Sequence, residues 1–502
     1  MRMKSKILGI SAVCLLMFAE RGKTQNNPYN EVSIASPNAA SLGKFVDLPV
    51  NYHTGLPQVD IPIYTIKEGT LSVPVSLSYH TGGLKITEPA SWVGANWALN
   101  AGGAITRNVS GAPDERYTST VSYQEKGYFS DNGYKSYPLD GPSGTENWSA
   151  IANGTRDGEP DMFFFNMPGY SGKFFFRDDR TPVFIPQQDI KVEYNYTGTG
   201  SIQSFTLTVP DGTAYSFGVT AASGDTDPVE KTDAYSSSTG YVTGTVISSW
   251  YLNKIESSDK RFSISLNYTQ DNYAFNTLSL YPVANDNKTN SDQNDNYEYK
   301  MIRNRINGVR ISSITASNMQ INFIPGAART DLSSYTSSNG FLESTGESAG
   351  NTLGEIQIAD NASNVFKKYL LSYSYFSGSN SLASGIYFSG WSLEKDKTRL
   401  KLDKIQEQSM DGSIINPPCE FTYNNPGSVP RRLSFAQDHW GYFNGETGNN
   451  TLIPTYSKAT DASGLNYQIV NGADREPNWP SMQNGSLKSI ILRNGQNSEF
   501  LN

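Results

Sequence analysis

The chemistry that this sequence offers most densely is that of neighbouring carboxylates. Asp157, Glu159 and Asp161 alternate within five residues, and Asp114 directly precedes Glu115. Two such groups can cleave a glycosidic bond, one as the acid and the other as the base or nucleophile. However, a glycine and a proline separate the first three, and these residue types favour exposed turns. We therefore expect solvated loop carboxylates rather than a glycosidase site.

Histidine and cysteine are scarce, which narrows the other catalytic alternatives. His53, His80 and His439 each adjoin an aromatic residue and show none of the spacings of a zinc site. No Gly-x-Ser-x-Gly nucleophile elbow lies near them, although the members of a serine triad need only meet in space. The cysteines are Cys14 and Cys419, and we interpret Cys419 as a buried small hydrophobic residue. We expect no enzyme activity, no metal and no cofactor.

Tryptophan offers a different chemistry, the stacking of an indole ring on the C–H face of a sugar. Trp92, Trp97, Trp391 and Trp440 are the candidates for contact with a ligand or a surface. Aromatic side chains also dominate the cores of β proteins, so core packing is the competing interpretation of all four.

Composition indicates the kind of fold that must position these residues. The 502 residues are 18% charged and 12% aromatic, with 30 Tyr and 23 Phe. Charged residues usually make up about 25% of a chain, and disordered chains have few aromatic residues. This polar, aromatic-rich composition is typical of β-sheets. The net charge of -8 and the pI of about 5.2 argue against nucleic acid as a partner.

The N-terminus has the pattern of a secretory signal peptide. Arg2, Lys4 and Lys6 precede an apolar run over residues 7–19, which is shorter than the about 20 residues of a membrane-spanning helix. We predict a signal peptide over residues 1–25 and export to the cell surface or the exterior, with the periplasm and the outer membrane as further possibilities. We expect no membrane span after signal cleavage.

Alternating apolar residues predict β-strands in the first half of the chain. Residues 71–79 alternate strictly, and residues 205–217 predict a hairpin with a Pro-Asp-Gly turn. The two triple-phenylalanine segments, residues 163–165 and 174–176, flank a glycine-rich loop and predict two buried strands. We expect a sandwich-like β domain over residues 26–220.

Two polar stretches predict loops. We interpret residues 221–245 as a flexible linker between domains, because such a composition does not bury a core. Residues 285–296 are rich in Asp and Asn, but they lack the glycine and the closing glutamate of an EF-hand loop. A solvated loop is the preferred interpretation of this second stretch.

The second half, residues 246–502, contains a degenerate repeat. Each copy has an apolar-x-x-Ile segment, a polar turn and an aromatic-rich return strand. The copies begin at Leu252, Ile311, Leu353, Leu402 and Leu487. Their irregular spacing suits hairpins that are added one after another to a growing sheet. The last copy stops where the others reach the return strand, so we expect an incomplete C-terminal region with an exposed edge.

The segment SWVGANWALNAGGAITR, residues 91–107, resembles the Gly-x-x-Trp-x-Leu…Ile-x-Arg element of secreted RHS/YD-repeat proteins. That family is related to the β-rich shell components of insecticidal toxin complexes. Residues 160–174, 210–218 and 437–445 are similar to further segments of the same long exported proteins. The resemblance implies a large β shell that can enclose a C-terminal toxin or effector. This sequence lacks a tight run of Tyr-Asp repeats, the Asp-Pro-x-Gly-Arg core motif and a variable C-terminal toxin, so encapsulation and self-cleavage are not assigned to it.

These observations together predict an all-β chain, with a sandwich-like N-terminal domain followed by a meandering sheet of irregular hairpins. The expected function is that of a non-enzymatic scaffold within an exported RHS/YD-repeat surface or toxin-delivery protein. Its partner would be the C-terminal repeat and toxin region of the same polypeptide. The alternative is a carbohydrate- or surface-binding adhesin module, whose partners would be surface glycans.

Overall fold

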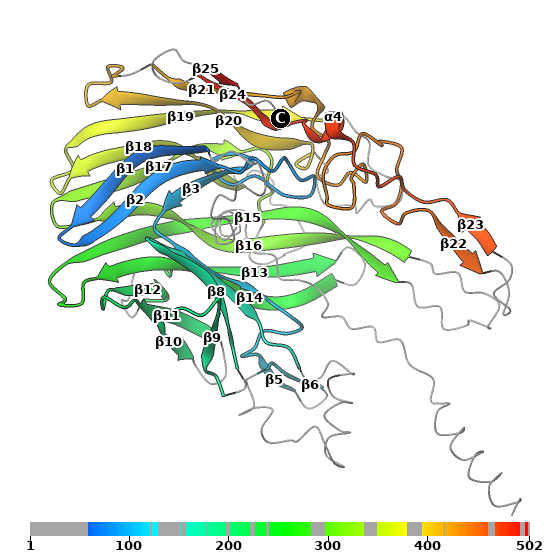
Figure 1. The fold of residues 1–502 in the computed structure, drawn as a ribbon, viewed down its shortest axis with the longest axis horizontal. Helices are drawn as coiled ribbons and strands as arrows, with labels where there is room; N and C mark the ends of the chain where they lie inside the picture. The colour runs from blue at the N-terminus through cyan, green and yellow to red at the C-terminus, as the bar shows by residue number, and fades with distance from the viewer. Residues whose placement is uncertain are drawn as a thin grey trace, which may run out of the picture.

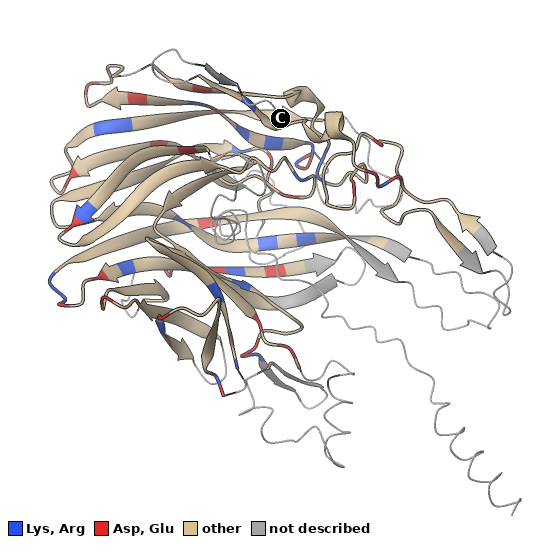
Figure 2. Ribbon diagram, in the orientation of Figure 1, with Lys and Arg blue, Asp and Glu red and all other residues tan. Residues whose placement is uncertain are grey.

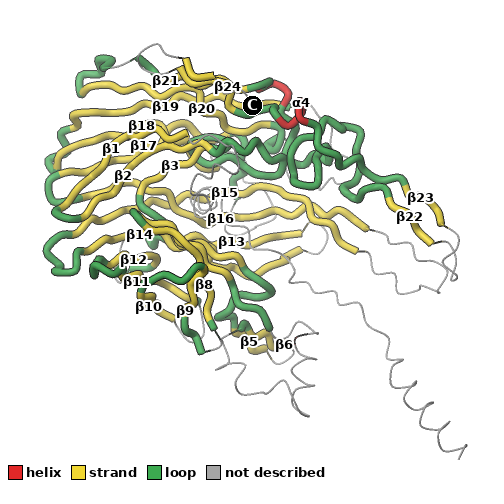
Figure 3. Tube along the Cα trace, in the orientation of Figure 1, coloured by secondary structure: helices red, strands yellow, loops and turns green. Residues whose placement is uncertain are grey.

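The computed structural model describes fourteen stretches of the chain, and the fold is given for these alone: 59–120, 123–128, 151, 157–177, 179–196, 201–220, 226–236, 240–282, 297–335, 349–378, 394–415, 417–459, 467–491 and 497–499. Strands make up almost all of their regular structure, so the predicted all-β fold class is confirmed (Figure 3). None of the described helices has the length and hydropathy needed to carry the chain across a bilayer. The predicted signal peptide and the polar loop 285–296 lie outside the described residues.

The first described strands form a small antiparallel sheet with the predicted alternation. Val73, Val75 and Leu77 are buried, whereas the residues between them are wholly or partly exposed. This follows from strand geometry, since successive side chains point to opposite faces. The sheet has the order β1 (Val59–Glu68), β2 (Leu71–Tyr79) and β3 (Trp97–Ala101).

The next strands are built around phenylalanine. Phe163, Phe165, Phe174 and Phe176 are fully buried, and the ring centroids of Phe163 and Phe174 lie 5.3 Å apart. Both hairpins predicted in this region are confirmed as β7–β8 and β11–β12. The strands are β4 (Ala104–Asn108), β7 (Met162–Met167), β8 (Tyr170–Phe176), β9 (Pro182–Ile185), β10 (Lys191–Tyr196), β11 (Ile202–Thr208) and β12 (Ala214–Gly218). A separate hairpin consists of β5 (Tyr117–Thr120) and β6 (Tyr123–Lys126).

Residues 221–245, predicted to be a flexible linker, belong to the sheet over most of their described length, so that prediction is wrong there. β13 (Val229–Ser236) pairs with β14 (Gly240–Glu256) and also with β16 (Tyr297–Thr315). The segment is polar, but strand pairing uses the backbone N–H and C=O groups that nearly every residue carries. Strands β4 and β12 also pair with β14. The large sheet therefore contains strands from both sides of the predicted boundary.

The second half forms the predicted meander of antiparallel hairpins (Figure 1). From β14 onward, each strand pairs with the next in the order β15, β16, β17, β18, β19, β20, β21, β24 and β25. Their bounds are β15 (Ser263–Pro282), β17 (Met319–Arg329), β18 (Ala349–Asp360), β19 (Val365–Ser377), β20 (Thr398–Ser409), β21 (Cys419–Tyr423), β24 (Leu487–Ile491) and β25 (Asn497–Glu499). The described residues within 424–459 and 467–486 lie outside the large sheet and contain η2 (Pro426–Ser428), β22 (Tyr456–Ala459), β23 (Tyr467–Val470) and α4 (Trp479–Met482).

A β-bulge explains the apolar-x-x-Ile motif of each copy. In a regular strand, residues three apart point to opposite faces. At each copy, however, the second motif residue has no opposite partner in the preceding strand, so one extra residue is inserted. Leu402 and Ile405, for example, are both buried, and the unopposed residue between them is Asp403. The other unopposed residues are Asn253, Ser312, Gly354 and Lys488.

Tyrosine hydroxyl groups connect these bulges across the sheet. Tyr268 donates to the carbonyl oxygen of Leu252 at 2.7 Å. Tyr373 makes the same contact with Leu353 at 2.8 Å, and Tyr423 with Leu402 at 2.6 Å. In each case the acceptor is the first residue of an apolar-x-x-Ile motif. The aromatic return strand of each of these copies is thereby tied to the strand that precedes it.

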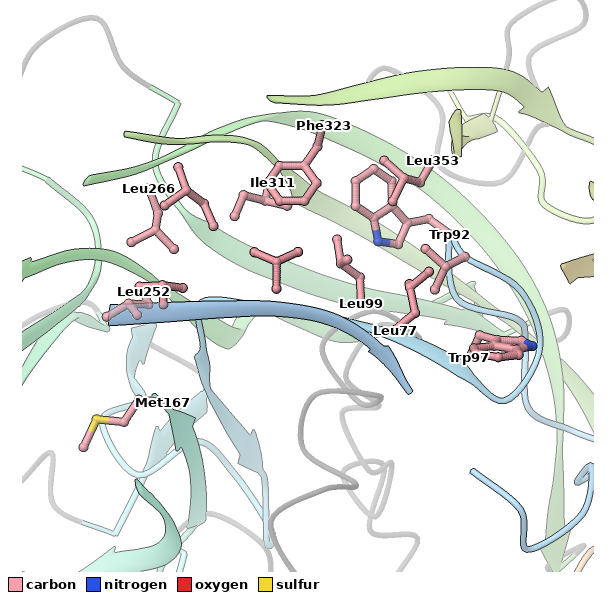
Figure 4. Packing of buried hydrophobic residues seen from close by; sticks show 14 of the residues in the cluster. Leu77, Trp92, Trp97, Leu99, Met167, Leu252, Leu266, Ile311, Phe323 and Leu353 are labelled. Atoms are coloured by element: carbon pink, nitrogen blue, oxygen red, sulfur yellow. The ribbon is translucent and has the colours of Figure 1, made fainter. Parts of the chain in front are cut away.

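The three-stranded sheet packs on the meander, so one core joins the two halves of the chain. Leu77 and Leu99 lie in the same hydrophobic cluster as Ile311 and Phe323 (Figure 4). The Tyr369 hydroxyl also donates to the carbonyl oxygen of Ile63 at 3.2 Å, and Figure 1 shows β1 and β2 beside β17 and β18. The two layers thus combine strands from the predicted N-terminal domain with strands from the hairpin region.

Candidate functional site

The tryptophan-rich segment that carries the family resemblance forms a tight turn against the meander. Ser91 Oγ donates to the carbonyl oxygens of Trp97 at 2.6 Å and Gly94 at 3.0 Å. Gly94 has a φ of 114°, and a Cβ atom at this position would lie 3.0 Å from the backbone nitrogen of Leu402. Glycine meets both demands, a backbone conformation that L-residues avoid and a close approach to β20.

Trp92 and Trp97 are core residues, so their predicted role in contacting a ligand or a surface is wrong. Their exposed fractions are 5% and 1%. Trp97 Nε1 donates to the Tyr423 hydroxyl at 2.9 Å, and its ring centroid lies 4.7 Å from that of Phe421. Both indoles fill the space between the two layers (Figure 4). Trp391 lies outside the described residues.

Trp440 is the candidate that the structure places on the surface. Its exposed fraction of 75% is the highest among the large hydrophobic side chains of the described residues. The backbone N–H groups of Trp440 and Tyr442 donate to Oδ1 of the buried Asp438 at 2.8 and 3.0 Å. Gly441 completes this turn with a φ of 91°. The backbone is therefore fixed while the indole faces solvent.

Trp479, which was not predicted from the sequence, is a second exposed tryptophan in the segment between β21 and β24. It begins α4 and is 58% exposed. Arg475 connects its segment to the Trp440 turn, because the guanidinium group donates to the carbonyl oxygens of Leu452, at 2.6 Å, and of Asp438. The sequence signal was the Asn-Trp-Pro run at 478–480, which is typical of a capped helix start. Tyr456 and Ile469 are also exposed, on the β22–β23 hairpin that projects from the body (Figure 1).

The carboxylates predicted to be solvated are in part buried together, so that prediction is wrong for Asp114, Glu115 and Asp161. Their exposed fractions are 0%, 1% and 0%, and that of the neighbouring Arg107 is 2%. Arg107 Nη1 donates to Glu115 Oε2 at 2.6 Å and lies 3.5 Å from Asp161 Oδ2. Glu159 is exposed as predicted. Residues 45 or more apart in the sequence converge here, which their local turn residues could not indicate.

Asp114 and Asp161 hold each other through reciprocal hydrogen bonds. The backbone N–H of Asp161 donates to Asp114 Oδ1 at 2.9 Å, and that of Asp114 donates to Asp161 Oδ2 at 3.1 Å. Burial raises the pKa of Asp161 to about 8 and the pKa of Asp114 well above its usual value. Burial likewise raises the pKa of the half-buried Asp157 to about 7.

Arg107 fastens this carboxylate cluster to the large sheet. Its Nη2 donates to the carbonyl oxygen of Ile247 in β14 at 2.7 Å, and its guanidinium carbon lies 5.3 Å from the ring centroid of Trp250. The cluster connects the loop after β4, the loop before β7 and β14. In this arrangement the carboxylates organise loops, and their buried side chains present no surface to a glycan.

The histidines and the cysteine play smaller parts. His439 is exposed beside Trp440, His80 is half-buried and His53 lies outside the described residues. No three His, Cys, Asp or Glu side chains gather at metal-binding geometry within the described stretches. Cys419 is 6% exposed and belongs to the core, which confirms its interpretation as a small hydrophobic residue.

Comparison with known proteins gives weak likeness to solved structures alone. No family model matches the chain, and no curated protein does. Among solved structures, the chain is similar to "Crystal Structure of TcdB2-TccC3 without hypervariable C-terminal region", with 11% identity and a TM-score of 0.30. The match covers 74% of this chain and 16% of that one, so this chain spans a small part of the length of that protein.

Proposed function

We propose that this chain is a non-enzymatic scaffold within an exported RHS/YD-repeat surface or toxin-delivery protein. The observation that carries the proposal is the regular construction of the meander. Each repeat copy adds a strand pair in register, with a bulge at the same motif position and a core residue on either side of it. A sheet that grows by repeated hairpins with the same bulge position is suited to forming an extended wall.

The place of the tryptophan-rich segment supports the same proposal. Its turn packs against β20, and Trp97 reaches Tyr423 in β21. The element that resembles the RHS/YD-repeat family therefore fixes the small sheet to the repeat sheet. This is a structural task, and it gives a physical reason for glycine and tryptophan at these positions.

The genomic DNA beyond the codon for Asn502 tests this proposal directly. We expect further Tyr-Asp repeats and a variable toxin domain, either in frame or after a frameshift. An unrelated gene after a stop codon would count against it. Mass spectrometry of the exported protein tests the predicted signal peptide, because the mature N-terminus should then lie between residues 20 and 26, whereas an uncleaved N-terminus would contradict it.

A second candidate function, a glycan- or surface-binding module, is favoured by the exposed indoles of Trp440 and Trp479. Exposed tryptophan on a fixed turn can stack on a sugar ring without a large entropy cost. Binding of the full chain to a glycan array tests it. Trp440→Ala should then abolish binding and leave the fold intact, whereas Ile469→Ala, which removes an exposed aliphatic side chain, serves as the matched control.

A further inference from the structure

Buried charges of both signs gather where β17 and β20 meet the loop after β21. Elsewhere, charged residues of the two signs are interspersed over the fold (Figure 2). Here the side chains have exposed fractions of 5% or less. The members of this arginine cluster are Arg329, Arg399, Arg431, Arg432, Asp331 and Asp396.

Each of the two buried carboxylates forms an ion pair with one of the four arginines. Arg329 donates from Nε and Nη2 to Asp331 at 2.9 and 2.8 Å. Arg431 donates from Nε and Nη2 to Asp396 at 2.7 Å each. Both pairs have the two parallel hydrogen bonds that make arginine–carboxylate contacts strong. Neither aspartate makes such a pair with a second guanidinium group in the described structure.

Among the described residues, Arg399 and Arg432 donate hydrogen bonds to backbone carbonyl groups alone. Each donates through Nη2 to two of them, which belong to Ile86, Pro430, Asp331 and Lys395. Nε and Nη1 of both side chains are buried and have no hydrogen-bond partner among the described residues. A guanidinium group carries five N–H donors, so more than half of the donors on each side chain are unsatisfied.

The cluster also has more positive than negative charges. Burial, together with the charge of Arg432, lowers the pKa of Arg399 to about 9, so the group still carries its charge at neutral pH. The half-buried Glu88 attracts Arg399 from the edge of the cluster. Four buried cations nonetheless face two buried anions, and a buried charge without a partner is costly. Water can accept the unsatisfied N–H groups, but it does not supply the missing negative charge.

We propose that Arg399 and Arg432 form an enclosed binding site for a small inorganic anion of the size and charge of chloride. Such an ion accepts several hydrogen bonds and offsets the positive charge that remains in excess of the carboxylates. Both side chains are only 2% exposed, so they are shielded from solvent and we expect a small ion rather than a larger organic anion. The anion would stabilise the junction of β17, β20 and the loop after β21.

Thermal unfolding of the full chain tests this site. The protein is transferred into sodium gluconate and titrated with sodium chloride at constant ionic strength. Because a ligand that binds only the folded state stabilises it by mass action, the midpoint temperature should rise by about 1–4 °C and then saturate. A titration with sodium sulfate separates a preference for monovalent from divalent inorganic anions. The same midpoint throughout both titrations would overturn the proposal.

Two variants locate the effect. Arg399→Met and Arg432→Met should each abolish the saturable response, because each removes donors from the site. Arg261→Met, at an exposed arginine paired with Asp259, should retain it. A response that survives in both cluster variants would place the anion elsewhere and contradict the assignment.

A crystal of the wild-type protein grown in sodium bromide decides the question even if the variants fail to fold. Bromide replaces chloride and scatters anomalously. We expect an anomalous peak within hydrogen-bond distance of the Nε or Nη1 atoms of Arg399 and Arg432. Ordinary water density there without an anomalous peak would overturn the proposal.

Discussion

At the scale of single residues, this protein buries several ionisable groups that its sequence places in turns. One guanidinium group, that of Arg107, faces the carboxyl groups of Glu115, Asp114 and Asp161. Full ionisation of all three would leave a net negative charge in the interior. The raised pKa values of Asp114 and Asp161 indicate that the pair keeps at least one proton at neutral pH.

This carboxylate cluster makes stability depend on pH. Asp161 has a pKa of about 8 in the folded protein, whereas an unperturbed aspartate ionises near 3.8. Between these values the unfolded chain binds fewer protons, so the free energy of unfolding should fall as pH rises from about 4 to about 8. Asp161→Asn should weaken this fall, as measured by urea unfolding at intervals across that range.

Asp189→Asn is the matched control for the pH experiment, because Asp189 is an exposed aspartate outside the cluster. It should leave the pH dependence as it is in the wild type. If Asp161→Asn and the wild type showed equal slopes, the cluster would not be the source of the dependence.

The tyrosine contacts between neighbouring strands can also be tested one residue at a time. Tyr373→Phe removes the hydroxyl that donates to Leu353 and leaves a buried carbonyl group without this donor. We expect a loss of about 1 kcal/mol in the free energy of unfolding. Tyr456→Phe, at an exposed tyrosine, should change it by much less. Equal effects in denaturant titrations would show that the buried hydroxyl contributes nothing specific.

At the scale of elements, the bulge is the feature that makes each hairpin fit the next. The apolar-x-x-Ile spacing does not suit a regular strand, because residues three apart would point to opposite faces. With one unopposed residue inserted, both apolar side chains point into the core and the strand keeps its pairing on either side. The repeat therefore encodes a register as well as a hydrophobic pattern.

Deletion of Asp403 tests this register. Without the bulge residue, Leu402 and Ile405 would be two residues apart in a regular strand, and regular alternation would keep both side chains on the core face. We therefore expect the deletion to cost well below the about 2–5 kcal/mol that removal of a buried leucine or isoleucine side chain costs. Denaturant unfolding of the deletion variant measures it.

Asp403→Ala separates register from side-chain chemistry. This substitution keeps the bulge and removes the partly exposed contact with Lys401 at 3.1 Å. Exposed ion pairs are worth about 0–1 kcal/mol, so the substitution should also cost little. A loss of about 2–5 kcal/mol in the deletion variant alone would refute the register explanation.

At the scale of the whole molecule, the order of the chain differs from the order of the layers. The N-terminal sheet lies on strands that come more than 200 residues later, and Trp92 and Trp97 fill the space between them. Neither layer can expose its inner face without losing the packing of the other.

The full chain should therefore unfold in a single thermal transition. Far-UV circular dichroism reports the loss of strands, and near-UV circular dichroism reports the loss of tryptophan packing between the layers. Coincident curves are expected because both signals depend on the same core. Two separate transitions would instead support the division into an N-terminal domain and a hairpin domain.

Features of the fold that depend on neighbouring residues could be predicted from the sequence. Features that depend on residues far apart in the chain could not. The hairpins were predictable because alternation and turn residues act within a few positions, as in β11 and β12. The strand β13 was not predictable, because its side chains are polar and its position in the sheet depends on backbone pairing at both edges. The position of Trp97 was also not predictable, since its partner Tyr423 is 326 residues away.

The sequence by itself determined the all-β class, the succession of hairpins and the buried state of Cys419. Each of these follows from short-range patterns of apolar residues and turns. Only the tertiary structure decided which tryptophans are exposed, which carboxylates are buried and which arginines lack a counter-charge. The physical reason is that burial and charge balance depend on distant segments that meet in space, and no local pattern records which segments meet.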